Sequence, residues 1–281
     1  MLRFKAEARH ASANTARLSG LASQRNLHSL VPMLLTLLLV PGIARAKIVQ
    51  HAAREREAGV VLRTRPPVAP GVTSLPALVG TDPIVARINQ NLDAVERNLL
   101  NAMHACKAQA RSSKAAFGWT RTVQVTANGP RMLSFLVQDD TSCGGAYPDK
   151  DRLALVYDLQ SGRPVDWLAL LPAGFAASST ASKGVGGSKE GLVTSPSMMA
   201  LYRRHYPLNV PDVDRSMRNE CRDSVQDGFT IWPDTTAHAL MIQPTAENQA
   251  AAACAVPVKL TLPMLKETGT VAPLLDALEP E

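Results

Sequence analysis

The sequence lacks the residue spacings that mark the common metal, phosphate and nucleophile sites. It has four cysteines but no Cys-x-x-Cys pair, and its six histidines show no His-x-x-x-His or His-Glu-x-x-His spacing. The glycine-rich stretch from Gly184 to Lys189 lacks the Gly-Lys-Ser/Thr order of a Walker loop, and Glu190 stands where a nucleophile elbow needs a second glycine. We therefore predict no metal site, no cofactor and no catalytic residue, although a Ser-His-Asp triad built from distant residues stays open.

An apolar run long enough to cross a bilayer is also absent. A basic flank at 25–28 precedes an apolar run from Leu30 to Val40, and the small-residue site Ala44-Arg45-Ala46 follows. These are the parts of a secretory signal peptide. The 15 residues from Leu30 to Ala44 fall short of the roughly 20 that a membrane span needs. We predict cleavage before Lys47, no membrane span after cleavage, and a periplasmic or secreted mature protein.

A broad excess of positive charge is missing from the predicted mature chain. The whole sequence has 30 Lys and Arg against 24 Asp and Glu. The first 46 residues hold six of the basic residues and one of the acidic ones, which leaves 24 against 23. A near-neutral chain lacks the basic field with which proteins bind nucleic acid, so this class of function is excluded.

All four cysteines lie in the predicted mature part, and an even number in an exported chain predicts disulfides. Three connectivities are possible. We favour Cys106–Cys143 with Cys221–Cys254, because these pairs join sequence neighbours and close loops spanning 37 and 33 positions. Loop-closure entropy gives about 4 kcal/mol for each. A zinc site is the alternative, but His104-Ala105-Cys106 is the one close His/Cys pair in the sequence.

The chain divides into three predicted segments. Residues 1–46 form the signal peptide, with a long or misassigned N-terminal extension over 1–24. Residues 47–71 are a proline-containing tether, and 72–281 form a single α+β domain, or two subdomains joined near 175–192.

Hydrophobic periodicity predicts one long amphipathic helix from Thr81 to about Ala110, opened by a capping residue and Pro83. An antiparallel β meander then follows, with Asp139 to Asp151 as a loop and further helices packed on the sheet. Among the other predicted elements are strands at 122–126, 132–138, 153–157, 165–167, 229–232, 237–242 and 254–262, a mobile loop at 175–192, and helices beginning at 195, 212 and 273.

An ordered set of short motifs resembles a family of exported domains of unknown function. The motifs are, in order, Leu75-Pro76, Ile88 to Leu92, Leu133-Ser134, Gly144-Gly145-Ala146-Tyr147-Pro148 and Tyr157 to Arg163. The family includes the extracellular half of a lysozyme-responsive anti-sigma factor (RsiV) and the non-catalytic domain of a peptidoglycan deacetylase (PdaC). Tyr147 replaces the family's usual His, and Ser161 its usual Thr. The resemblance implies an α+β fold and a non-catalytic recognition role at the cell envelope.

Two functions follow from these observations. The leading hypothesis is a non-enzymatic recognition or sensor-type module that binds an unknown envelope protein or a peptidoglycan fragment. Its candidate ligand-binding residues are Gly144, Gly145, Tyr147, Asp149 and Asp151. The alternative is a cell-wall-directed hydrolase that uses carboxylates of the Asp139–Asp151 loop as an acid/base pair; the sequence leaves open whether the protein is an enzyme and favours that it is not.

Overall fold

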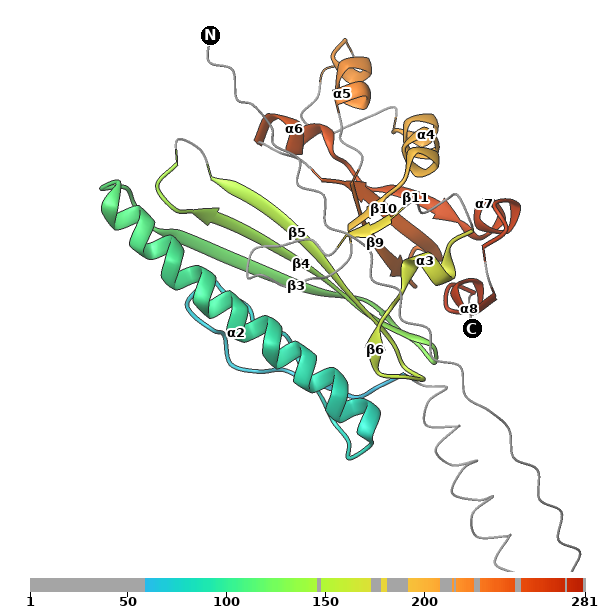
Figure 1. Cartoon of the computed structure of the whole chain (residues 1–281), viewed down its shortest axis with the longest axis horizontal. Helices are drawn as coiled ribbons and strands as arrows, with labels where there is room; N and C mark the ends of the chain where they lie inside the picture. Colours follow the sequence, from blue (N-terminus) through green and yellow to red (C-terminus); the bar gives the residue numbers. More distant parts are fainter. Residues whose placement is uncertain are drawn as a thin grey trace, which may run out of the picture. The chain divides into compact units, whose positions relative to one another are not determined.

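The computed structural model describes most of the chain that follows the predicted signal peptide (Figure 1). The described residues are 59–145, 148–172, 178–180, 192–207, 214, 216–224, 228–245, 249–270 and 272–279. The predicted signal peptide, the predicted start at Lys47, Tyr147 and the Gly184–Lys189 loop lie outside them. Within the described ranges no helix has both the length and the apolar character to cross a membrane.

The long helix predicted from periodicity is α2 (Pro83–Ser112). Its first turn is capped by Asp82, whose Oδ1 accepts a hydrogen bond from the Ile84 amide at 2.7 Å, and proline occupies the position where a missing N–H costs nothing. One stripe of the helix is buried: Val85, Ile88, Leu92, Val95, Leu99, Cys106 and Ala110. Before the helix, β1 (Leu62–Arg63), inside the predicted tether, pairs with β2 (Ala77–Leu78).

The stripe of α2 packs on an antiparallel meander of four strands (Figure 1). The strands are β3 (Gly118–Asn128), β4 (Met132–Ser142), β5 (Asp149–Asp158) and the short β6 (Arg163–Pro164). Alternate residues of β4 and β5 face the helix, and their core cluster includes Leu133, Phe135, Val137, Leu153, Leu155 and Tyr157. The expected α+β class with an antiparallel meander is confirmed.

A second antiparallel sheet, in the order β11-β10-β9-β8-β7, covers part of the other face of the meander. Met132, Leu136 and Val156 of the meander belong to the same buried cluster as Phe229 and Leu240 of the second sheet. The first half of β4 is therefore apolar on both faces except at Ser134, which explains the largely apolar sequence from Met132 to Val137. The strands are β7 (Ser178–Thr180), β8 (Leu192–Thr194), β9 (Phe229–Asp234), β10 (Ala239–Pro244) and β11 (Val258–Thr261), and the helices around them are α3 (Trp167–Leu170), α4 (Pro196–His205), α5 (Arg218–Ser224), α6 (Gln249–Cys254), α7 (Leu262–Glu267) and α8 (Ala272–Asp276).

Several predicted elements differ from the structure. The predicted strand at 165–167 is wrong, because Asp166 caps α3 by accepting a hydrogen bond from the Leu168 amide, and Trp167 opens that helix. Cys254 ends a helix instead of opening a strand, since the alanine run before it favours helix. β7 lies within the predicted loop at 175–192, and the helix predicted from Asp212 is described only as α5, from Arg218 onward.

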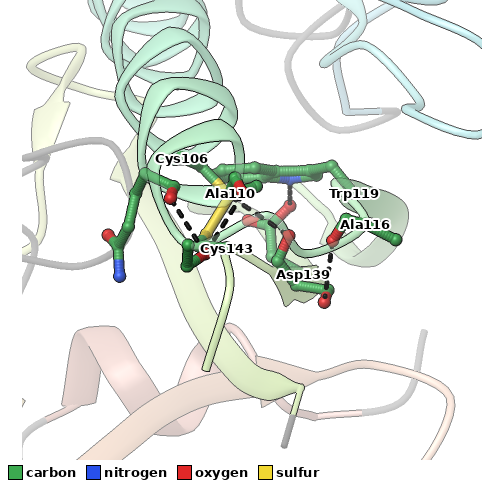
Figure 2. The surroundings of a disulfide bond; sticks show 9 residues. Cys106, Ala110, Ala116, Trp119, Asp139 and Cys143 are labelled. Atoms are coloured by element: carbon green, nitrogen blue, oxygen red, sulfur yellow. Dashed lines mark hydrogen bonds between the residues drawn. A yellow bond between two sulfur atoms is a disulfide. The ribbon is translucent and has the colours of Figure 1, made fainter. Parts of the chain in front are cut away.

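The two disulfides have the connectivity that the sequence favours. Cys106 of α2 pairs with Cys143, just past β4, with 4.6 Å between their Cα atoms (Figure 2). Cys221 of α5 pairs with Cys254 of α6, with 4.9 Å between theirs. The first bond ties the long helix to the meander, and the second ties two short helices beside the second sheet.

Candidate functional site

The residues from Asp139 to Asp151 do not form the predicted loop. β4 continues to Ser142 and β5 begins at Asp149, so only the residues from 143 to 148 connect the strands. Side chains alternate between the faces of a strand, so neighbouring aspartates point to opposite sides of the sheet. The prediction of a single acidic loop is therefore wrong, and these carboxylates divide between two environments.

Asp139 lies on the α2 side, in a buried ion pair. The carboxylate accepts hydrogen bonds from Arg121 Nε at 2.8 Å and Nη2 at 2.7 Å. It also accepts one from Trp119 Nε1 at 2.9 Å, which Figure 2 shows. Arg121 stands directly opposite Asp139 across β3 and β4. The exposed fractions of the two side chains are 1% and 5%. Asp139 is thus buried in an ion pair, and a substrate cannot reach its carboxylate for acid or base catalysis.

The glycines of the Gly-Gly-Ala-Tyr-Pro motif have a packing explanation. Gly144 has φ +104°, and a Cβ there would collide with Ser113 Oγ and lie 3.3 Å from the Cα of Ala110 at the end of α2. This close approach and the positive φ require glycine. Gly145 is exposed, as is Asp149 at the start of β5. The structure therefore ties Gly144 to the helix beside the first disulfide.

The opposite face of the meander forms a polar cleft with the second sheet. Gln138 and Asp140 of β4 stand opposite Arg152 and Lys150 of β5, respectively. They border a pocket of about 240 Å³. The lining is completed by Asp151, Thr230, Gln243, Pro244, Thr245, Ala252, Ala255, Val256 and Pro257. Of the predicted ligand-binding residues, Asp151 borders this cleft. It stands opposite Asp139, however, so strand alternation turns its side chain to the α2 face.

Arg152 joins the two walls of the cleft. Its Nε donates to Gln138 Oε1 at 3.2 Å, and its Nη1 donates to Gln243 Oε1 of β10. No described residue accepts a hydrogen bond from Nη2. Burial lowers the pKa of the guanidinium and the Asp140 carboxylate raises it in part, while the side chain keeps solvent-exposed surface. Arg152 therefore presents a positioned positive charge to the cleft.

The segment from Cys254 to Val256 forms the side of the cleft opposite the meander and is held in place by hydrogen bonds and a disulfide. Gln243 Nε2 donates to the Ala255 carbonyl at 2.5 Å. The hydroxyl groups of Tyr202 and Tyr206 donate to the Val256 and Cys254 carbonyls at 3.0 and 2.9 Å. Burial raises the pKa of Tyr202, with a smaller contribution from Tyr206, so this hydroxyl keeps its proton and remains a donor. The Cys221–Cys254 disulfide anchors the same segment.

The cleft combines side chains of both charges. Lys150 and Arg152 supply cations, Asp140 supplies a carboxylate, and the glutamines and threonines add neutral hydrogen-bonding groups. In the described ranges, no three His, Cys, Asp or Glu side chains are grouped as a metal site would need. Such a lining can hold a polar ligand that carries both a carboxylate and an amino group.

The principal residues of this cleft carry little signal in the sequence. No motif marks Arg152, and Gln243, to which it donates a hydrogen bond, lies 91 positions further along the chain. Glutamine in an otherwise apolar strand is the one local sign, because a buried amide needs hydrogen-bond partners. Nothing in the sequence shows that these partners are Arg152 and the Ala255 carbonyl.

Comparison with known proteins gives a structural neighbour but no family assignment. No family model matches the chain, and no curated protein matches it. A similar solved structure is that of a member of the DUF3298 family from Bacteroides fragilis, with a TM-score of 0.41 and 10% identity over 72% of this chain and 75% of that one. This neighbour belongs to a family of domains of unknown function, whereas the resemblance to RsiV and PdaC stays a prediction. A likeness at this level supports no statement about function.

Proposed function

We propose that this chain is an exported, soluble recognition module of the cell envelope, periplasmic or secreted, and that the polar cleft binds a small cell-wall fragment. The predicted signal peptide supports export. Two disulfides fit an oxidising compartment, because thiols in the cytosol are kept reduced.

The position of Arg152 carries the proposal. A guanidinium is a planar donor that matches a carboxylate, and here two of its nitrogens are already held by glutamines from both sheets. A side chain that is held in place loses less freedom when ligand binds. The unbonded side of the guanidinium can therefore bind a ligand carboxylate, and the Lys150 ammonium can form an ion pair with the same carboxylate. Asp140 can form an ion pair with a ligand ammonium group.

Peptides of peptidoglycan carry both of these groups, and this favours a cell-wall fragment as the ligand. The size of the cleft points the same way. A pocket of about 240 Å³ has room for a small polar group. A stable protein partner would instead cover a broad surface, about 800 Å² on each side, that extends beyond such a pocket. An envelope protein is the other ligand class, and the experiment below separates the two.

The test is a binding measurement on protein obtained by exporting the full chain, so that both disulfides form. We expect soluble peptidoglycan fragments to bind saturably in isothermal titration calorimetry. Arg152→Gln should weaken binding by about tenfold or more, because it removes charged hydrogen bonds. Arg204→Gln is the matched control, since Arg204 is exposed on α4 and outside the cleft.

Mass spectrometry of the same mixtures separates the remaining outcomes. Fragments recovered intact agree with recognition, whereas fragments recovered cleaved would identify an enzyme. The proposal is wrong if the fragments do not bind or if Arg152→Gln binds as wild type does. Specific capture of an envelope protein that Arg152→Gln abolishes would keep the cleft as the site and replace the ligand class.

A further inference from the structure

A second pocket lies at the opposite end of the meander. It has a volume of about 390 Å³ and shares no lining residue with the polar cleft. Met132 at the start of β4 borders it, six positions before Gln138 of the cleft, which corresponds to roughly 20 Å along a strand. Its other lining residues are Arg131, Asp158, Ser161, Arg163, Pro164, Val165, Asp166, Ala169, Leu170 and Pro273.

Two arginines border this pocket, and no described residue accepts a hydrogen bond from either side chain. Arg131 immediately precedes β4, and Arg163 belongs to β6. The strand register brings them together, because Asp158 of β5 pairs with Met132 on one side and with Arg163 on the other. Neither guanidinium makes a hydrogen bond or ion pair with any described residue. Arg131 is half-buried, so its charge has lost part of its hydration without gaining a partner.

The two carboxylates of the pocket are already engaged by the main chain and a serine. Asp158 accepts hydrogen bonds from the Gln160 amide at 2.8 Å and from Ser161 Oγ at 3.0 Å. Asp166 caps α3 by accepting from the Leu168 amide at 3.0 Å. Within the described part of the chain, the pocket thus holds two charged donors without acceptors beside two acceptors that have donors. A negatively charged ligand is the complement of this arrangement.

The remaining wall is apolar. Val165, Ala169 and Leu170 contribute side chains from the turn and the short helix after β6, and Pro273 contributes one from α8. Ligand pockets commonly combine such a wall with a few charged groups that fix orientation.

We propose that this pocket is a second binding site, independent of the polar cleft, and that it takes a carboxylate attached to a small apolar group. The arginines hold the carboxylate, and Val165, Ala169, Leu170 and Pro273 cover the apolar group. The C-terminus of a peptide and a short-chain acid share this chemistry.

Hexanoate is the probe for the test, and hexanamide is its matched control because it has the same chain without the charge. We expect hexanoate to saturate the exported protein and to shift the methyl NMR signals of Val165, Ala169 and Leu170. The affinity for hexanamide should be lower than that for hexanoate by about tenfold or more. A C-terminal peptide that competes with hexanoate would identify the source of the carboxylate as a chain end, and lack of competition would assign the site to short-chain acids.

Four variants make the test specific. Arg163→Gln and Arg131→Gln should each weaken hexanoate binding by about tenfold or more, whereas Arg152→Gln in the polar cleft should leave it unchanged. Asp166→Asn should strengthen binding a few-fold, because it removes a competing negative charge and keeps a good helix cap. Arg163 is exposed, so its replacement should leave the fold intact, and thermal unfolding checks Arg131→Gln. Equal binding of hexanamide and hexanoate, or unchanged binding by Arg163→Gln, would overturn the proposal.

Discussion

We expect replacement of the Asp139 carboxylate by an amide to lower the free energy of unfolding strongly, although the side chain keeps its size. Asp139→Asn keeps the shape of the side chain but removes the negative charge that Arg121 faces. Arg121 Nη1 is buried and has no hydrogen-bond partner among the described residues, so its guanidinium has no second acceptor to use. The side chains are 1% and 5% exposed, so water cannot replace the lost charge. Breaking a buried pair in this way costs about 3–5 kcal/mol.

Equilibrium unfolding in urea, with the disulfides intact, measures this cost. Asp139→Asn should lower the free energy of unfolding by about 3–5 kcal/mol. The double variant Arg121→Met/Asp139→Leu should recover most of it, since apolar side chains leave no charge in the interior. Asp140→Asn is the control, because this neighbouring residue is exposed and its replacement should change stability by no more than about 0.5 kcal/mol. A cost below about 1 kcal/mol for Asp139→Asn would refute the reasoning.

Two further predictions concern Gly144 and Tyr202. Gly144→Ala should destabilise the protein by about 1–3 kcal/mol in the same urea assay, because the added Cβ meets the end of α2 at a positive φ. Gly129→Ala, where a Cβ would meet no atom within 4 Å, is the control, and equal effects of the two changes would contradict the packing role of Gly144. Burial raises the pKa of Tyr202, so the folded protein holds a proton that the unfolded chain releases near pH 10, and the free energy of unfolding should fall as the pH rises above about 10. Tyr202→Phe should make this fall shallower, and identical pH profiles for wild type and variant would show that Tyr202 has no part in it.

The helix and the first strands were open to prediction because their determinants are local. An α-helix bonds each residue to one four positions away, so the Asp82-Pro83 start and the apolar stripe were sufficient to predict α2. The core of β4 was visible as an apolar run. Its polar continuation to Ser142 was not, because charged residues at the end of a strand have the composition of a loop.

The candidate site depends on contacts between residues far apart in the sequence, and the local sequence pattern does not show these contacts. Asp139 and Asp140 look alike in the sequence. Pairing with β3 places Asp139 against Arg121 under the helix, and the alternation of the strand turns Asp140 toward the cleft. Arg152 became a site residue only when β10 brought Gln243 beside it.

The sequence by itself determined the fold class and the long amphipathic helix, since these follow from short-range periodicity. It favoured one of three disulfide pairings, and the structure has that pairing. The tertiary structure alone decided which charges are buried and which face solvent. The physical reason is desolvation: the cost of a charge depends on whether water or a partner surrounds it, and only the packing of both sheets and α2 sets that for Arg121, Asp139 and Arg152.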